Sequence, residues 1–541
     1  MAKSLGLSFK KVPKTPVLLL DYLYHSEKVQ KFFPGVSTFD CSRSPESDAS
    51  WPSPVHRAAL VETLKRQNRL WGASAKTMEN LNLLASQHCR VVVTGQQVGL
   101  FTGPAYTIYK ALTAVKVAEA YRRQGVDAVP VFWMATEDHD LEEVGRISIL
   151  TADSTLKSVQ FSQKSEGNRL PVGPISFDSS ITGHLDVFLQ GLPDSEFKPV
   201  MAAQLKRFYR EGNTFAQAFA EVLSFLLSEY GLILMDPREP TLKNLAKPVF
   251  HQVAEAWGGL DRLIRGRIQE LARAGYPPQV SGDAGTSFLF LEQDGQRWAV
   301  VGTRDGFSLK GNSRVVDDLQ VLIEQAPEQV SPNVLFRPVV QDFLLPTLAY
   351  VAGPSEVAYY AQISPLYHAL GRVMPRVVPR ASITVIEKRI QRLLAKYHLE
   401  FGDLFQGSGP LLKHIVESTV NQDVSARFDG LGKDIADHLG KMEGPLKSVD
   451  PTLIGALGTT RKKIQYQLEH LRAKFVGAES RQRETLTRQV DNLLRTLYPS
   501  RGLQERHINI FYFLSRYGPE FLEEVYDAID LSNPDHQLLF M

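Results

Sequence analysis

The segment Arg90-Val-Val-Val-Thr-Gly-Gln-Gln-Val-Gly-Leu-Phe-Thr-Gly-Pro-Ala-Tyr-Thr-Ile-Tyr-Lys110 decides the fold class of this chain. Its β-branched run, Val91–Val93, is typical of a buried parallel strand. The run enters a loop that contains three glycines, and Pro104 suits the first turn of the helix that follows. The segment therefore predicts one strand, one loop and one helix of an α/β sheet.

The glycine loop has two interpretations. Backbone N–H groups at a helix start are unpaired and carry partial positive charge, so such a loop can bind a phosphate or another anion. Alternatively, the loop is only a tight turn in the sheet. Its spacing matches neither the dinucleotide-binding fingerprint nor the Walker A pattern. The loop by itself leaves both interpretations open.

A second buried-strand run, Ala128–Ala135, is followed by the polar cluster Glu137-Asp138-His139-Asp140. With a helix over about residues 104–123, the two runs predict a right-handed βαβ unit, and ligands of such sheets bind at the carboxyl ends of the strands. We expect the cluster to supply a general base, an Mg²⁺ ligand or a partner for a substrate amine. The competing interpretation is that Asp138 or Asp140 only caps the next helix.

A third segment that we expect to border the site follows Thr347–Ala352, another predicted core strand. Gly353, Glu356, Tyr359 and Tyr360 come after it, and we expect them to precede a helix. Glu356 would hold a substrate amine, or it would serve as an ordinary helix cap. Arg337 and Arg380 lie elsewhere in the sequence. Each would bind a carboxylate or phosphate through two parallel donors, or would belong to a buried structural ion pair.

Several longer motifs occur along the chain in a fixed order. They are Val93-Thr-Gly-Gln-Gln97, Thr102-Gly-Pro-Ala-Tyr-Thr-Ile-Tyr-Lys110, Pro130-Val-Phe-Trp133, Glu137-Asp-His-Asp140, Ser331-Pro-Asn-Val-Leu-Phe-Arg-Pro338, Gln341-Asp342, Pro346-Thr-Leu-Ala-Tyr350, Gly353-Pro354, Glu356, Val378-Pro-Arg380, Gln504-Glu-Arg506 and Tyr517-Gly-Pro-Glu-Phe521. In these motifs the chain resembles the cysteine ligases of bacillithiol biosynthesis, the BshC family. The resemblance covers essentially the whole chain. One departure is Ser355, where a smaller residue, usually glycine, is expected.

The resemblance implies a Rossmann-like core related to nucleotidyl transferases and class I aminoacyl-tRNA synthetases, with inserted connecting segments and a helical coiled-coil domain that pairs two subunits. It also implies a reaction that joins the carboxylate of cysteine to the amine of glucosaminyl-malate, forming the low-molecular-weight thiol. A carboxylate has no leaving group, so we expect ATP to activate it as an acyl-adenylate or an acyl-phosphate. Mg²⁺ would be held by the protein or would arrive with ATP.

The expected site residues form two groups. Around the activated carboxylate or the phosphates we place Thr94, Gly95, Gln96, Gln97, Thr102, Gly103, Tyr106, Lys110, Arg337, Gly353, Glu356, Tyr359 and Arg380. Glu137, Asp138, His139 and Asp140 form the catalytic group, with His139 as the expected base because imidazole ordinarily titrates nearest neutral pH. A carboxylate-metal hydrolase and a noncatalytic nucleotide-binding scaffold are the alternative functions.

We expect residues 1–383 to form the Rossmann-like core, with insertions at about 150–228 and 255–330. The first insertion contains a predicted strand at Ser158–Ser162. In the second, alternating apolar residues from Ser287 to Lys310 predict antiparallel strands, with turns at Asp294-Gly295 and Asp305-Gly306. Residues 384–500 would form the coiled-coil domain, and residues 501–541 would return to the core.

Two apolar seams mark the predicted coiled coil. Intervals of four, three and four residues relate Ile464, Leu468, Leu471 and Phe475, and the same spacing recurs in Leu486, Val490, Leu493 and Leu497. Gly477-Ala478 predicts a shift or break between the two seams. The first seam would pair two subunits as a homodimer, or it would be buried in an intramolecular helical hairpin. The basic run Arg461–Lys463 is best explained as a solvated flank.

The composition fits a cytoplasmic enzyme that acts on small molecules. A net charge of +2 argues against a nucleic-acid binder. Because Cys41 and Cys89 are the only cysteines, neither a disulfide framework nor a cysteine-rich zinc site is expected. The N-terminal residues lack the apolar core of a signal peptide, and Val17–Leu20 is too short to span a membrane.

Overall fold

The computed structural model describes residues 3–33, 54–151, 153–162, 170–281, 284–304, 306–311, 315–316, 318–419 and 423–541. The chain divides into two compact units. The first comprises Met1–Glu387 together with Gly502–Met541, and the second is Lys388–Arg501. Cys41 and Asp305, on which two of the expectations above rest, lie outside the described residues.

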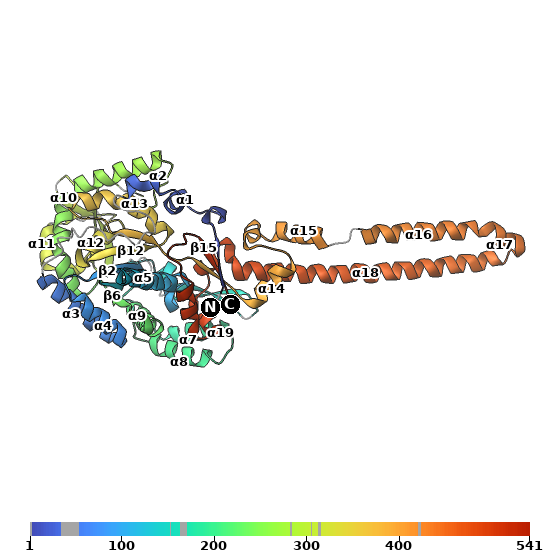
Figure 1. Cartoon of the computed structure of the whole chain (residues 1–541), viewed down its shortest axis with the longest axis horizontal. Coiled ribbons are helices and arrows are strands. Elements are labelled where there is room, and N and C mark those ends of the chain that lie inside the picture. The colour runs from blue at the N-terminus through green and yellow to red at the C-terminus, as the bar shows by residue number, and fades with distance from the viewer. Residues whose placement is uncertain are drawn as a thin grey trace. The chain divides into compact units, whose positions relative to one another are not determined.

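A five-stranded parallel sheet lies at the centre of the first unit, as Figure 1 shows. Its strands, in spatial order, are β13 (Arg376–Pro379), β12 (Thr347–Ala352), β2 (Arg90–Gln96), β3 (Ala128–Met134) and β6 (Ile233–Met235). Every residue of β3 is buried, which is typical of a strand covered by helices on both faces. These strands confirm the predicted α/β class.

Strands that follow β2 in the sequence lie on both sides of it in the sheet. Helix α5 (Tyr106–Arg123) connects β2 to β3, and β6 then adds on the far side of β3. Strand β12 instead pairs with the opposite edge of β2, with Tyr350 beside Val93. The topological switch point therefore lies between β2 and β12, where ligands bind in open α/β sheets.

The first insertion contains a hairpin and three helices. Strands β4 (Arg146–Leu150) and β5 (Leu156–Gln160) pair antiparallel, followed by α7 (Ser180–Gly191), α8 (Lys198–Phe208) and α9 (Phe215–Leu226). The strand expected at Ser158–Ser162 thus begins and ends earlier. The reason is that Phe161 leaves the ladder to pack its buried ring against Phe177 and Phe215.

The second insertion forms an antiparallel sheet. Helix α10 (Pro240–Arg273) precedes it, and its strands are β7 (Thr286–Gln293), β8 (Gln296–Thr303), β9 (Gly306–Leu309), β10 (Val315–Val316) and β11 (Val330–Pro332). Asp294 and Gly295 connect β7 to β8 with φ angles of 53° and 69°. Positive φ at both central residues is the signature of a type I′ hairpin turn, so this predicted turn is confirmed.

The last forty residues return to the first unit. Strand β15 (His536–Phe540) pairs antiparallel with β1 (Lys3–Leu7) and parallel with β14 (Ile383–Ile386), so the N and C labels lie close together in Figure 1. Helices α19 (Ile510–Tyr517) and α20 (Glu520–Ala528) precede β15. Phe511, Tyr512 and Phe513 of α19 are buried in the apolar core of this unit.

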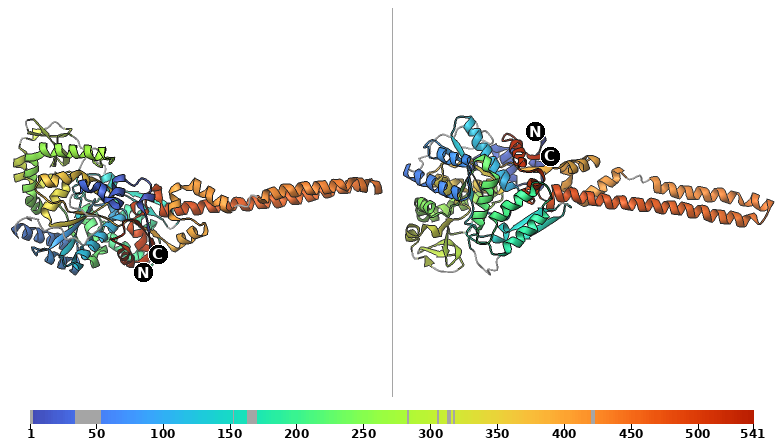
Figure 2. Two further views of the ribbon diagram at one scale, coloured as in Figure 1. Left: turned by 45° about the horizontal axis from the view of Figure 1, so that its top comes forward. Right: turned by 90° about the horizontal axis from the view of Figure 1, so that it is seen from below.

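Among the described residues of the second unit, the regular elements are all helices. It contains α14 (Lys388–Lys396), α15 (Ser408–Thr419), α16 (Asp423–Lys441), α17 (Glu443–Val449) and α18 (Leu453–Leu497). In both views of Figure 2, α16 lies alongside α18, and the rings of Phe428 and Phe475 are 5.9 Å apart. The predicted break at Gly477-Ala478 is wrong, because α18 continues through it. One glycine costs only about 1 kcal/mol in a helix interior, too little to end a helix of this length.

A membrane-spanning helix requires a long apolar stretch, and none of the helices in the described part of the chain has one.

Candidate active site

The loop after β2 has an unusual backbone. Phe101, Thr102 and Gly103 have consecutive positive φ angles of 48°, 72° and 70°. Positive φ is uncommon for residues other than glycine, and the ψ of −160° at Gly103 places that residue in a region that only glycine adopts readily. Such a loop persists only where its surroundings hold it in place.

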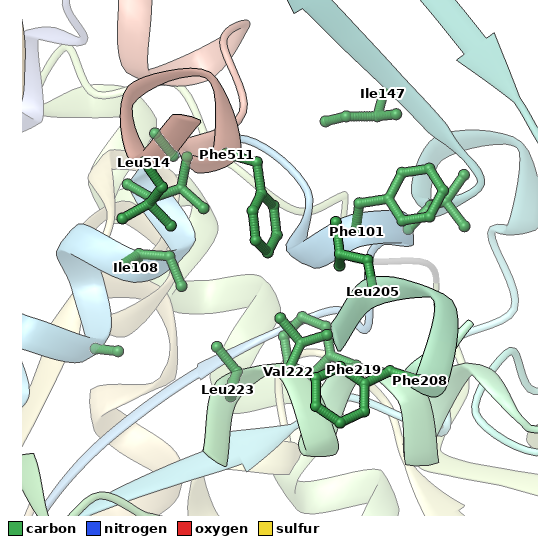
Figure 3. Packing of buried hydrophobic residues seen from close by; sticks show 14 of the residues in the cluster. Phe101, Ile108, Ile147, Leu205, Phe208, Phe219, Val222, Leu223, Phe511 and Leu514 are labelled. Atoms are coloured by element: carbon green, nitrogen blue, oxygen red, sulfur yellow. The ribbon is translucent and has the colours of Figure 1, made fainter. Parts of the chain in front are cut away.

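The C-terminal segment holds this loop. The side-chain amide of Asn509 donates hydrogen bonds to the carbonyl oxygens of Phe101 (2.7 Å) and Gly103 (2.6 Å), and the Ala105 N–H donates to Ile508 (2.9 Å). The Phe101 ring lies in the buried apolar cluster near Leu205 and Phe511, as Figure 3 shows. Sequence reasoning missed Asn509. The only signal was its position just after the Gln504-Glu-Arg506 motif.

Much of the glycine loop, which the sequence suggested as an anion site, is buried. Residues 98–103 are buried, with Thr102 only 1% exposed. The N–H groups of Gly99, Thr102 and Gly103 bond to carbonyls of the same loop. The loop is therefore not an open phosphate cradle in this structure, and the polar side chains that reach the surface beside it are those of Gln96, Gln97 and Tyr106.

Thr94 and Gly95 belong to the sheet itself. The Thr94 hydroxyl donates to the carbonyl oxygen of Val351 (3.0 Å). A Cβ at Gly95 would lie 2.7 Å from the carbonyl oxygen of Trp133, so glycine permits the close approach of β2 and β3. Both residues shape the floor of the site. The Gln96 amide, one residue further, donates to the Tyr106 hydroxyl (3.1 Å).

Lys110 and Glu356 form a buried ion pair across the switch point. The Lys110 ammonium also donates to the carbonyl oxygen of Gly95 (2.6 Å), while Glu356 accepts from the Gly353 N–H (2.6 Å) and the Tyr350 hydroxyl (2.6 Å). Burial lowers the pKa of Lys110, and the charge of Glu356 opposes this shift. Burial raises the pKa of Glu356, but Lys110 and the Gly353 N–H together hold it below its usual value. The two charges satisfy each other.

Helix α13 (Pro354–Ala369) begins earlier than expected. Glu356, Tyr359 and Tyr360 lie within its first two turns, and Glu356 forms a capping box with Gly353. The expectation that these three residues precede the helix is therefore wrong, because Pro354 is well suited to a first helical position. The capping interpretation of Glu356 is confirmed, and its carboxylate already accepts from Lys110, the Gly353 N–H and the Tyr350 hydroxyl.

Arg337 is a half-buried cation at the same edge of the sheet. It begins α12 (Arg337–Leu344) and donates to Gln341 (2.9 Å) and to the hydroxyl of Tyr359 (3.0 Å). Among the described residues, no carboxylate forms an ion pair with Arg337. Gln341 in turn donates to Asp342 (2.9 Å), whose pKa burial raises to about 6. Arg337 is thus positioned by neutral groups and retains the charge that a carboxylate or phosphate would require.

Arg380 follows β13 and has a carboxylate partner. It donates to Glu505 (2.7 Å), and both side chains are buried. Glu505 also accepts from the Ser382 hydroxyl (2.8 Å) and the Ile383 N–H (2.8 Å). The structure therefore shows the buried ion-pair alternative for Arg380. Its guanidinium lies 5.1 Å from the centre of the Tyr106 ring, so it forms part of the wall behind that phenol.

Two of the four catalytic candidates have structural partners. Glu137 forms a buried ion pair with Lys243 of α10, which also donates to the carbonyl oxygen of Val330 (2.7 Å). Asp140 caps α6 (Leu141–Val144) by accepting from the Glu143 N–H (2.9 Å). The capping alternative is confirmed for Asp140. Sequence reasoning missed Lys243, because a lysine on a helix more than 100 residues away gives no signal of the carboxylate it meets.

Asp138 and His139 are the pair that faces outward. Their side chains are 36% and 38% exposed, and the imidazole Nδ1 lies 3.7 Å from an Asp138 carboxylate oxygen. The Gln97 amide donates to the other carboxylate oxygen at 2.6 Å. The Asp138 carboxylate also accepts from the His139 backbone N–H (2.7 Å), and at 3.7 Å from Nδ1 its charge can stabilise the ring once the ring has accepted a proton. Within the described residues, no group of three or more histidine, cysteine or acidic side chains is arranged to hold a metal ion.

The site thus separates into a buried frame and a surface that can meet a ligand. The frame contains Thr94, Gly95, Thr102, Gly103, Lys110, Glu137, Glu356 and Arg380. The ligand-facing groups are the amides of Gln96 and Gln97, the Tyr106 phenol, the Arg337 guanidinium and the Asp138–His139 pair. Together they offer donors for an anion and an acceptor for a proton at one edge of the sheet.

Comparisons with known proteins cover the whole chain. Residues 7–381 match the model of the N-terminal Rossmann-like domain of bacillithiol biosynthesis BshC, and residues 383–541 match that of its C-terminal coiled-coil domain. The second match includes residues 502–541, which belong to the first compact unit. A solved Campylobacter jejuni structure described as an arginyl-tRNA synthetase is 10% identical over 85% of this chain, with a TM-score of 0.23 that supports no conclusion.

Three curated relatives carry the name "Putative cysteine ligase BshC". The relative from Salinibacter ruber is 35% identical over 97% of this chain and 96% of its own length. Those from Koribacter versatilis and Solibacter usitatus are each 34% identical over 98% of both chains. With both domain models and full-length relatives at this identity, the chain belongs to the BshC family of bacillithiol biosynthesis.

Proposed function

We propose that this chain joins the carboxylate of cysteine to the amine of glucosaminyl-malate, with ATP activating the carboxylate. The observation that carries this proposal is the half-exposed Asp138–His139 pair, fixed by Gln97 at the switch point of the sheet. An amine must lose a proton when it forms an amide. A positioned imidazole beside a carboxylate is suited to accept that proton.

The other half of the reaction concerns the carboxylate. ATP would supply the leaving group that a free carboxylate lacks. The loop N–H groups at Gly99, Thr102 and Gly103 already bond to carbonyl oxygens. The donors that would contact the phosphates or the carboxylate at this edge are therefore the side chains of Gln96, Gln97 and Arg337. We propose that Mg²⁺ enters the site with the nucleotide.

We also propose that the protein acts as a homodimer through its second unit. Leu471 is 56% exposed and Tyr466 is 64% exposed on α18, although α16 lies alongside this helix. Apolar side chains left exposed on a soluble helix are typical of a surface that meets a partner. The intramolecular hairpin therefore covers only part of the predicted seam.

The reaction is tested by incubating purified protein with cysteine, glucosaminyl-malate, ATP and Mg²⁺ and following the products by mass spectrometry. We expect the amide, with AMP or ADP identifying the mode of activation. His139→Ala and Asp138→Ala should each lower the rate about 10²–10⁴-fold, the usual contribution of a positioned base. His88→Ala, at an exposed histidine, is the matched control and should retain the wild-type rate.

Two results would contradict the proposal. One is the absence of amide product even when the protein is added back to extract of cells that lack it. The other is ATP binding without turnover under any of these conditions, which would favour the nucleotide-binding scaffold. Full activity of His139→Ala would leave the reaction in place but remove the assigned base.

A further inference from the structure

A polar cleft of about 400 Å³ opens beside the glycine loop, outside the frame described above. Pro104 lies where the cleft meets the loop, and the carboxylates of Asp140, Glu142 and Glu143 line the cleft from the segment after β3. Arg146 of β4 and Arg506 of the C-terminal segment also line it. The cleft therefore combines carboxylates and guanidinium groups within one depression.

Pairing between distant segments brings the two arginines together. Ser148 forms a parallel β-bridge with Ile508, and Arg146 and Arg506 each lie two residues before the bridged residue. The bridge joins the two segments, and Arg146 and Arg506 both line the cleft beside it. Both arginines are exposed, and neither forms an ion pair with a carboxylate of the described chain.

Gln97 connects the cleft to the Asp138–His139 pair. Its amide nitrogen lies 2.6 Å from Asp138 and 3.2 Å from a carboxylate oxygen of Glu143, which lines the cleft. Burial raises the pKa of the Tyr106 phenol. The charges of Arg380 and Arg506 lower it, and those of Glu143 and Glu356 raise it further. The cleft therefore lies beside the switch point, and the hydrogen bond between Gln97 and Glu143 connects the two.

We propose that this cleft binds the acceptor, with Arg146 and Arg506 holding the two carboxylates of its malyl group. The inference rests on the proposed function and assigns that substrate a location. Guanidinium groups bind carboxylates through paired, charge-assisted hydrogen bonds. The carboxylates of Asp140, Glu142 and Glu143 in the same cleft complement the cationic amine of the substrate, and Gln97, which bonds to both Glu143 and Asp138, marks the part of the cleft nearest the Asp138–His139 pair.

Titration calorimetry of the full-length protein tests the assignment, with glucosaminyl-malate, malate, glucosamine and ATP as separate ligands. We expect Arg506→Gln and Arg146→Gln each to weaken the binding of glucosaminyl-malate about tenfold or more, the usual loss of a hydrogen bond between charged groups. Affinity for ATP should not change. Arg262→Gln, at an exposed arginine on α10 with no described partner, is the matched control and should bind all ligands normally.

The outcomes separate the two proposals. If wild-type protein binds and ligates glucosaminyl-malate but both arginine variants bind it equally well, the location is wrong and the proposed function stands. If the double charge reversal Arg146→Glu/Arg506→Glu retains affinity for malate, the location is also wrong. If the wild-type protein neither binds nor ligates glucosaminyl-malate, both proposals fail. A selective loss of glucosaminyl-malate and malate affinity in the variants supports the assignment.

Discussion

The side-chain amide of Asn509 donates a hydrogen bond to the carbonyl oxygen of Gly103 at 2.6 Å, across 406 residues of sequence. The same amide bonds to Phe101, so one side chain holds both ends of a backbone run with positive φ. The shape of the loop between β2 and α5 is therefore a property of the C-terminal segment as well as of its own glycines.

Removing this amide should destabilise the protein. Asn509→Leu keeps the approximate size of the side chain but leaves two carbonyl oxygens without their donor, at a cost of about 1–3 kcal/mol for each buried group. Urea unfolding measures the loss. Asn244→Leu serves as the control because Asn244 is exposed on α10 and bonds only to Pro240 of its own helix, at 3.0 Å. Equal stability of the two variants would show that the loop does not depend on Asn509.

Gly103 should not tolerate a side chain, and the reason is its backbone. A Cβ there would meet no atom closer than 3.8 Å, so space is available, but φ of 70° with ψ of −160° is unfavourable for any other residue. We expect Gly103→Ala to cost about 1–3 kcal/mol, and Gly103→Val to cost more and to weaken ligand binding. Gly183→Ala, within α7 and free of neighbours, should be neutral or stabilising. A Gly103→Val variant as stable as wild type would contradict the strain, and one that binds nucleotide and sugar normally would show that the loop does not position the ligand-facing side chains.

The Lys110–Glu356 pair should show strong coupling. Lys110→Met and Glu356→Gln each leave one buried group without its partner, for which the expected loss is about 3–5 kcal/mol. The double variant should recover much of this loss, because no uncompensated charge remains. Unfolding free energies of the four proteins form a double-mutant cycle. Lys198→Met, which removes a bond to the 96%-exposed Asp194 and one to the carbonyl oxygen of Leu192, should lower stability far less. Additive losses in the cycle would contradict the coupling.

His536 should make stability fall in mild acid. Burial lowers its pKa from 6.5 to about 4, and the ring bonds to the hydroxyls of Ser382 and Thr384, each at 2.8 Å. Because the unfolded chain binds a proton at higher pH than the folded chain, this contribution is complete above about pH 6.5. It is lost at about 1.4 kcal/mol per pH unit as pH falls toward 4.

Asp342 has the opposite effect on stability in the same pH range. Burial raises its pKa to about 6, so its protonation favours the folded state as pH falls. The informative quantity is therefore the difference in unfolding free energy between wild type and His536→Gln, measured from pH 7 to pH 4. We expect this difference to shrink by about 3 kcal/mol over the range. A constant difference would show that the folded and unfolded states protonate His536 alike.

The oligomeric state should depend on the exposed seam of α18. Leu468→Glu/Leu471→Glu places charge on apolar positions that a partner helix would cover, so light scattering should show a shift from dimer to monomer. Leu486→Glu is not a suitable control, because Leu486 is 9% exposed and already packed within its own unit. Glu469→Gln, on the exposed part of the same helix, is suitable. An unchanged dimer would assign Leu468 and Leu471 to packing within the hairpin.

The sequence located the edge of the site but did not distinguish its exposed residues from its buried ones. The position of Gln97, Asp138 and His139 at the carboxyl ends of neighbouring strands followed from the βαβ pattern alone. The same pattern suggested that Lys110 and Thr102 would contact a ligand, whereas both are 1% exposed. A glycine-rich loop has the same composition whether its amides face a ligand or bond to one another.

Local sequence determined the elements of this protein, because strand and helix periodicity and turn chemistry act over a few residues. The β2–α5–β3 unit and the Asp294-Gly295 turn follow directly from that chemistry. Only the tertiary structure decided which charges meet, since an ion pair such as Glu137 with Lys243 depends on how segments more than 100 residues apart pack. Tertiary structure likewise decided that Arg380 bonds to Glu505, that Asn509 holds the glycine loop, and that Arg146 and Arg506 line one cleft. Side-chain partners across the chain are set by packing in three dimensions, which no local pattern encodes.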